Sequence, residues 1–134
     1  MAENTVVKEQ LTEDMIEAGA QLTAKLDEMG VSVSAAMWFF EPDTNDWRLL
    51  IASPELASVG PRDVYQKIQA ARKGLAEKAS AVPMSVIRVI DANHELVHLL
   101  RMTLRTGAGI GRIRFSKNVI NGHFIEDALI YRVA

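Results

Sequence analysis

Two runs of alternating apolar residues near the end of the chain are separated by Asn121-Gly122, and this arrangement predicts a β-hairpin. Asn-Gly suits a two-residue type I′ turn, because both residues readily adopt positive φ angles. Such a turn fixes the register, and one face then carries apolar partners opposite each other together with one ion pair. The predicted pairs are Ile120–His123, Val119–Phe124, Lys117–Glu126, Phe115–Ala128 and Ile113–Ile130.

The first part of the chain predicts a long helix followed by another hairpin. Apolar residues recur every three or four positions over residues 9–29, which is the spacing of an amphipathic helix, and Gly30 is a suitable end for it. Residues 31–40 and 47–53 have the alternation of strands, and turn-forming residues around Pro42 separate them. The residues expected on the buried face of the helix are Leu11, Met15, Ala18, Leu22 and Leu26.

Three further elements are predicted in the middle of the chain. Gly60-Pro61 opens a helix that extends to Lys78, because proline is favoured in the first helical turn. Residues 85–90 are almost wholly apolar, which indicates a central strand covered on both faces, and residues 93–105 predict a third helix. The element order is then α-β-β-α-β-α-β-β, an α+β fold with a mixed sheet of about five strands and three helices packed on it. The residues expected on the buried face of the second helix are Val64, Ile68, Ala71 and Leu75.

Length and composition limit the class of protein. A chain of 134 residues, 49% of them hydrophobic, has the size and composition of one globular domain. The absence of cysteine excludes disulfides and thiolate chemistry. No apolar run approaches the roughly 18 residues of a membrane-spanning helix, and the acidic N-terminus does not resemble a leader. We expect a soluble cytoplasmic single-domain protein whose residues 1–8 form a flexible tail.

His94, Glu95 and His98 spell HExxH within the predicted helix 93–105. Two histidines one helical turn apart can bind one Zn²⁺, and the glutamate can activate a metal-bound water. This pentapeptide resembles that of zincin-type metallopeptidases, and the resemblance implies a zinc-dependent hydrolase. A third ligand would have to come from the last hairpin, where the candidates are His123, Glu126 and Asp127.

Three features of the same helix oppose the zinc interpretation. At 100° per residue the two histidines share a face with Arg101 and Arg105, whose permanent charges repel a dication. One zincin subclass has its third histidine where this chain has Leu104, and its glycine where this chain has Arg101. The histidines also lie nearly opposite the expected buried face. We therefore assign no catalytic residue, no metal and no cofactor, and the two histidines remain only an alternative. The residues expected on the buried face are Leu96, Leu100 and Leu104.

Charge is unevenly distributed along the chain. Residues 1–60 contain three basic and eleven acidic residues, whereas residues 61–134 contain twelve and six. Such a distribution can mark an anion-binding half, but it also allows the two halves, or two copies, to pair their charges. The residues that would bind an anion, a nucleic acid or a partner are Arg101, Arg105, Arg112 and Arg114. If this stripe of arginines is instead a solvated face, the acids expected to pair with it are Glu13, Glu17 and Asp27.

Two other segments need a structural explanation. A phosphate-binding glycine loop follows a strand and opens a helix, whereas residues 106–111 follow a helix, so that Gly107 is expected to cap this helix in a left-handed conformation. Trp38 and Phe39 are adjacent in the first predicted strand, and their side chains therefore point to opposite faces. A helix or a partner must cover at least one of these faces.

These observations favour a small non-catalytic binding protein. Edge hairpins, the aromatic first strand and the opposed charges of the two halves predict a homodimer or a complex with another protein. The first alternative is the zinc hydrolase, and the second is anion or nucleic-acid binding through the basic half. No membrane is expected as a partner.

Overall fold

The computed structural model describes residues 8–134, which form the predicted α+β fold around one mixed five-stranded sheet. Its elements are α1 (Glu13–Glu28), β1 (Ala35–Glu41), β2 (Asp46–Ser53), α2 (Glu55–Val59), α3 (Pro61–Lys73), two 3₁₀ segments (Ala76–Ala81 and Met84–Val86), β3 (Ile87–Asp91), α4 (Glu95–Arg101), β4 (Ile113–Ile120) and β5 (His123–Val133). The strand order is β3-β2-β1-β5-β4, with β2 and β3 parallel and the other neighbours antiparallel. No helix within residues 8–134 is long and apolar enough to cross a membrane.

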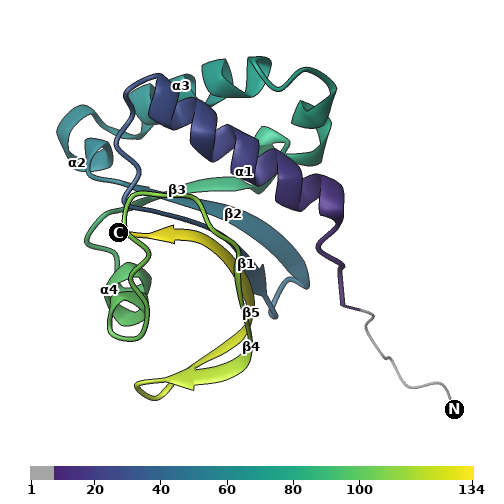
Figure 1. Ribbon diagram of the computed structural model, residues 1–134, viewed down its shortest axis with the longest axis vertical. Helices are drawn as coiled ribbons and strands as arrows, with labels where there is room; N and C mark the ends of the chain where they lie inside the picture. Colours follow the sequence, from purple (N-terminus) through teal and green to yellow (C-terminus); the bar gives the residue numbers. More distant parts are fainter. Residues whose placement is uncertain (1–7) are drawn as a thin grey trace, which may run out of the picture.

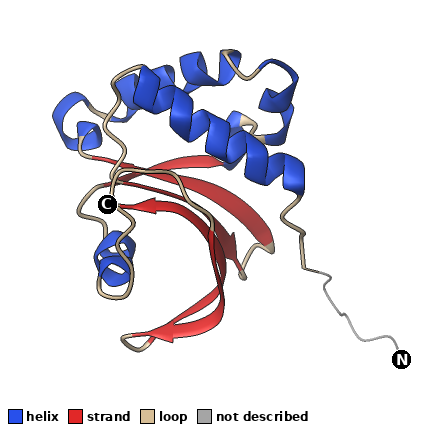
Figure 2. Cartoon of the chain, viewed as in Figure 1, coloured by secondary structure: helices blue, strands red, loops and turns tan. Residues whose placement is uncertain are grey.

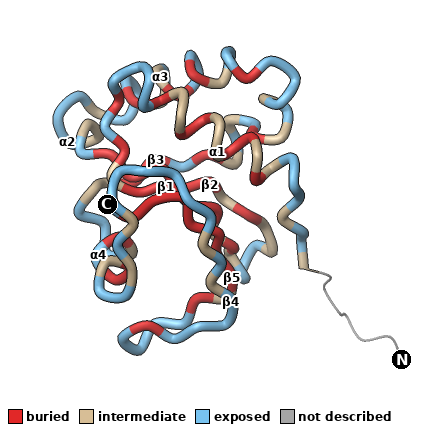
Figure 3. Tube along the Cα trace, viewed as in Figure 1, coloured by how far each residue is buried: buried red, intermediate tan, exposed pale blue. Residues whose placement is uncertain are grey.

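The sheet separates two apolar cores (Figures 1 and 2). Helices α1 and α3 cover one face, here named the upper face, and the short helix α4 lies against the other, lower face. Side chains of β1 alternate between the cores, with Trp38 in the upper core and Met37 in the lower core. Figure 3 shows that burial is concentrated where the strands pass between the helices. Most of the aromatic first strand is therefore buried on both faces within the same chain, whereas Phe39 on the lower face is only half-buried.

Helix α1 begins at Glu13, so the predicted start at residue 9 is wrong. Thr12 is the N-cap, and its Oγ1 accepts a hydrogen bond of 3.1 Å from the backbone N–H of Met15. Residues 8–11, here named the N-terminal strap, lie outside the helix, and the indole N–H of Trp47 donates to the carbonyl oxygen of Glu9 at 3.0 Å. The helical spacing of apolar residues extends into the strap because Leu11 packs on the same upper core.

Helix α1 approaches the sheet closely at Gly19. A Cβ atom at this position would lie 2.4 Å from Tyr131 Oη and 2.7 Å from Trp38 Nε1. The Tyr131 hydroxyl donates to the carbonyl oxygen of Ile16 at 2.6 Å. The Trp38 indole N–H donates to the carbonyl oxygen of Met15 at 3.1 Å and to Tyr131 Oη at 3.0 Å. Polar as well as apolar contacts therefore dock this helix on the sheet.

Strand β3 lies at an edge of the sheet, so the prediction of a central strand is wrong. Among the described strands it pairs with β2 alone. It is apolar because Val89 packs into the upper core and Ile90 into the lower core. The backbone N–H of Val89 donates to Tyr65 Oη of α3 at 2.9 Å, which protects this edge. An apolar run thus reports burial on both faces, but it does not report how many neighbours a strand has.

Two helices are shorter than predicted. Helix α3 ends at Lys73, and the chain continues toward Lys78 as a 3₁₀ segment. Helix α4 covers Glu95–Arg101 instead of residues 93–105. The predicted buried face of α4 is only partly correct, because Leu100 is buried as predicted but Leu96 and Leu104 are not fully buried. Its buried residues are Val97, Leu99 and Leu100, whereas Leu96 and Leu104 are half-buried.

The hairpin of β4 and β5 has the predicted turn and register. Asn121 and Gly122 adopt φ angles of 50° and 82°, as a type I′ turn requires. Four of the five predicted pairs are found in the ladder. The exception is Lys117–Glu126, because the register of the described strands passes from the pair Ser116–Asp127 directly to the pair Asn118–Ile125.

Lys117 kinks this hairpin and changes which side chains face the core. Its φ of 49° is unusual for a residue other than glycine and breaks the alternation of the strand. Beyond the kink Ile120 and Ile125 pack into the lower core. The predicted pair Val119–Phe124 consequently points outward, and its members are 65% and 57% exposed. The prediction of apolar pairs along one continuous face is therefore wrong beyond Lys117.

Candidate functional site

The two histidines of the HExxH segment lie at the surface of α4. His94 is the N-cap of this helix, and its Nδ1 accepts a hydrogen bond of 3.0 Å from the backbone N–H of Leu96. His98 is exposed one turn later. Within residues 8–134 no three metal-ligating side chains lie close enough together to hold an ion. One imidazole nitrogen of the HExxH pair is therefore already occupied by helix capping, and the structure adds no third ligand.

The arginines proposed as an anion site are held by separate partners. Arg101 Nε donates to the backbone oxygen of Ala134 at 2.8 Å. Arg112 Nη2 forms an ion pair of 2.8 Å with Glu17, and the hydrogen bond and attraction of this arginine lower the pKa of the glutamate. Arg105 is exposed and forms no ion pair with a described residue. Arg101 and Arg105 thus form no ion pair with a described residue, whereas Arg112 pairs with Glu17 and Arg114 with Asp127.

Part of the charge asymmetry is compensated within the chain. Arg132 is buried near the end of β5 and forms an ion pair of 2.7 Å with Asp27 at the end of α1. Its guanidinium also donates to the carbonyl oxygens of Val33 and Gly109, at 3.2 Å each. The expected pairing with the arginine stripe is therefore found for Glu17, whereas Asp27 pairs with Arg132, which lies outside that stripe.

The glycine-rich loop 106–111 lies along the end of β5. The backbone N–H of Thr106 donates to Val133 O at 2.9 Å, and that of Gly111 donates to Tyr131 O at 2.8 Å. Gly107 has the predicted left-handed conformation, with φ of 75°, but the C-cap of α4 is Met102. The prediction that Gly107 caps the helix is therefore wrong, because the helix ends earlier.

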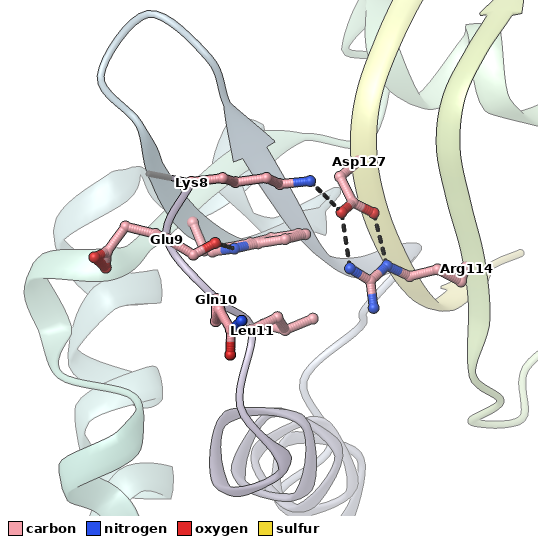
Figure 4. A pocket seen from close by; sticks show the side chains of 7 residues that line it. Lys8, Glu9, Gln10, Leu11, Arg114 and Asp127 are labelled. Carbon is pink, nitrogen blue, oxygen red and sulfur yellow. Dashed lines mark hydrogen bonds and ion pairs between the residues drawn. The ribbon is translucent and has the colours of Figure 1, made fainter. Parts of the chain in front are cut away.

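A polar pocket of about 260 Å³ lies between the N-terminal strap and the last two strands (Figure 4). The carboxylate of Asp127 points into it from β5 and is almost fully buried. Arg114 of β4 donates to both carboxylate oxygens, at 2.6 and 2.8 Å. Lys8 Nζ donates at 2.5 Å and Ser116 Oγ at 3.0 Å. The residues lining the pocket are Lys8, Glu9, Gln10, Leu11, Trp47, Arg114 and Asp127.

The same pocket combines ion pairs with aromatic contacts. Lys8 Nζ lies 4.8 Å from the ring centroid of Phe40 and 5.7 Å from that of Trp47. The guanidinium carbon of Arg114 lies 5.5 Å from the Trp47 centroid. Burial by itself raises the pKa of Asp127, but the hydrogen bonds from its donors and the nearby guanidinium outweigh this effect and hold the pKa well below its usual range.

These contacts attach the N-terminal strap to the sheet, so we interpret the polar pocket as structural. A carboxylate with a strongly lowered pKa is a poor general base near neutral pH. Lys8, the last residue of the predicted flexible tail, contributes to this attachment through its bond to Asp127. The rest of the predicted tail, residues 1–7, lies outside the described residues. The sequence feature that could have indicated this polar pocket is the charged residue Asp127, which directly precedes the apolar run of β5.

An apolar hollow of about 250 Å³ opens on the lower face beside α4. Its floor consists of strand residues from β1, β2 and β3, and the first turn of α4 forms one wall. Glu41 and Arg88 bring one charge of each sign to it, and neither forms an ion pair with a described residue. The lining residues are Phe39, Glu41, Leu50, Arg88, Ile90, His94 and Leu96.

The second exposed apolar feature is the pair Val119–Phe124, here named the hairpin patch. The two side chains are cross-strand neighbours near the tip of a hairpin that curves away from the rest of the sheet (Figure 1). Lys117 and Glu126 flank the patch, and neither forms an ion pair with a described residue. The patch was not predicted, because the alternating pattern places Val119 and Phe124 on one face with Phe115 and its partner, and the kink at Lys117 separates them.

Comparisons with protein-family models, with curated proteins and with solved structures find no match to this chain.

Proposed function

We propose that this protein is a non-catalytic binding protein that associates with itself through the hairpin patch. The observation that carries the proposal is the exposure of Val119 and Phe124, which are 65% and 57% accessible although both are large and apolar. An aromatic side chain in an exposed apolar patch is a common centre of a protein interface.

The backbone at Lys117 supports a functional reason for this exposure. A left-handed conformation costs a residue with a side chain on the order of 1 kcal/mol, and such strain is concentrated at functional sites. Here the strained residue is the one that turns Val119 and Phe124 out of the core. An unkinked strand would turn Val119 and Phe124 toward the lower core in place of Ile120 and Ile125, so the kink decides which apolar pair stays on the surface.

The sheet edge beside the patch also favours association. β4 pairs only with β5 among the described strands, and its outer edge therefore leaves backbone groups unpaired. At the opposite edge, Tyr65 already accepts a hydrogen bond from β3. The location of the protein in the cytoplasm, predicted from the sequence, remains part of this proposal.

Sedimentation or light scattering of the purified protein tests the proposal. The expected mass is twice the 14.8 kDa of one chain, and it should fall to one chain in the Phe124→Asp variant. Met102→Asp is the matched control, because Met102 is apolar and 67% exposed but lies outside the hairpin patch, and it should keep the larger mass. A wild-type protein that stays monomeric up to about 1 mM, where even a contact of roughly −4 kcal/mol would be half formed, overturns the proposal.

A further inference from the structure

We infer that Phe124 of one copy inserts into the apolar hollow beside α4 of a second copy, and that two such contacts close a symmetric dimer. This inference rests on the proposed self-association and specifies its geometry. It commits to a reciprocal contact between two different surfaces, rather than a contact of each hairpin patch with its own equivalent.

The hollow has the size and lining of a receptor for one aromatic side chain. Small-molecule sites have volumes of roughly 300–1,000 Å³, and the 250 Å³ of this hollow lies just below that range. Phe39, Leu50 and Ile90 present apolar surface from three neighbouring strands. Helix α4 is too short to cover this surface fully, which leaves the hollow open beside its first turn.

The hairpin patch cannot fill the hollow of its own chain. The hollow lies over β3, β2 and β1 on the lower face, whereas the patch belongs to β4 and β5 at the far edge of the sheet. Beyond Lys117 the lower-facing side chains of the hairpin are Ile120 and Ile125, so Phe124 points to the other side. A second copy must therefore supply the side chain.

Charges around the two surfaces complement each other. The hollow is flanked by Glu41 and Arg88, and the patch by Lys117 and Glu126. None of these four side chains forms an ion pair with a described residue, whereas seven other pairs do form within residues 8–134. Docking with Arg88 near Glu126 and Glu41 near Lys117 would neutralise all four. Such complementarity mainly fixes the orientation of an interface and excludes wrong partners.

Two-fold symmetry follows from the presence of both surfaces on each chain. If the hairpin of one copy enters the hollow of the other, a two-fold axis lets the reverse contact form as well. Two contacts double the buried area, which helps to reach the roughly 1,200 Å² that stable interfaces bury.

Mixing two monomeric variants tests this geometry. Leu96→Glu places a charge in the wall of the hollow but keeps the hairpin patch, and Phe124→Asp does the opposite. Each variant alone should be monomeric, while an equimolar mixture should form a complex of one chain of each, because one intact contact remains. Circular dichroism and urea unfolding confirm that each variant is folded.

A charge exchange between Arg88, which is exposed, and Glu126, which is half-buried, gives a second test that replaces no residue of the apolar core. Arg88→Glu should weaken self-association by roughly three- to tenfold, and adding Glu126→Arg should restore it. The inference is wrong if wild type and Leu96→Glu both self-associate equally well, or if the exchange restores nothing. In either case self-association through the hairpin patch would stand, since Phe124→Asp alone tests it, whereas a monomeric wild type would overturn both.

Discussion

Replacement of Gly19 by alanine should destabilise the protein, although the same change usually stabilises a helix. Alanine is favoured over glycine in a helix interior by about 1 kcal/mol. In α1, however, the added Cβ would lie 2.4 Å from Tyr131 Oη and 2.7 Å from Trp38 Nε1. These atoms are hydrogen-bonded to each other and to the backbone of α1, so they cannot move without losing partners.

The expected net effect is a loss of about 1–5 kcal/mol in the free energy of unfolding. Overpacking a core costs roughly 1–3 kcal/mol, and displacing the Tyr131 hydroxyl weakens two buried hydrogen bonds at about 0.5–1.5 kcal/mol each. The helix preference for alanine offsets about 1 kcal/mol of this cost. For a chain of this length the loss corresponds to a fall in Tm of roughly 4–18 °C.

Urea unfolding followed by tryptophan fluorescence measures this change, with Gly74→Ala as the matched control. Gly74 has an ordinary φ of −75°, and its added Cβ would meet chiefly the flexible end of Lys25, so we expect a change of no more than about 0.5 kcal/mol. Tyr131→Phe removes the nearest obstructing atom. The double variant with Gly19→Ala should therefore lose about 1 kcal/mol less than the sum of the single losses. An unchanged or higher stability of Gly19→Ala, or strict additivity in the double variant, would refute the reasoning.

Two further predictions concern the last hairpin. Asp127→Asn should cost about 1–2 kcal/mol near neutral pH, allowing for the partial exposure of Arg114 and Lys8, and the difference should shrink as the pH falls below about 4. The sign follows because the folded-state pKa is lowered, so the wild type loses this contribution on acidification; urea titrations at several pH values measure it. Lys117→Gly should raise stability by roughly 0.5–1 kcal/mol, since glycine tolerates φ of 49°, while Asn118→Gly should lower it in the same thermal unfolding assay.

Elements whose signals are local could be predicted from the sequence. The turn at Asn121-Gly122 depends on two residues that accept positive φ, and it set the register of both strands correctly. Helix α1 was recognised because Ala18, Leu22 and Leu26 repeat at the helical spacing and are buried. The element order followed from such patterns alone, and it is confirmed apart from the short helix α2 and the 3₁₀ segments, which were not predicted.

Features that depend on distant contacts could not be predicted. Nothing near Lys117 in the sequence favours a left-handed conformation, so its effect on the exposure of Phe124 was missed. The number of neighbours of β3 depends on how the sheet is assembled, and its apolar composition is compatible with an edge because helices cover both of its faces. Helix α4 ends before Thr103 although its hydrophobic spacing continues to Leu104.

The candidate sites were predicted only in part. The exposure of His94 and His98 followed from the helical wheel, but the N-capping bond of His94 did not. The arginines were grouped by their nearness in the sequence, whereas their partners come from α1, from β5 and from the final residue of the chain. Asp127 was considered only as a metal ligand, because its contact with Lys8 joins residues at opposite ends of the chain.

The position of β1 between β2 and β5 has a consequence for synthesis on the ribosome. Met37 of β1 pairs with Leu50, which is synthesised soon after it, whereas its other partner, Ile130, is synthesised much later. Until then one side of the most apolar strand offers unpaired amides and carbonyls next to Trp38, which is the kind of segment that chaperones bind and that aggregates recruit. Nascent chains that stop short of β5 should therefore be cleared by proteolysis or precipitate, while completed chains close the sheet at once.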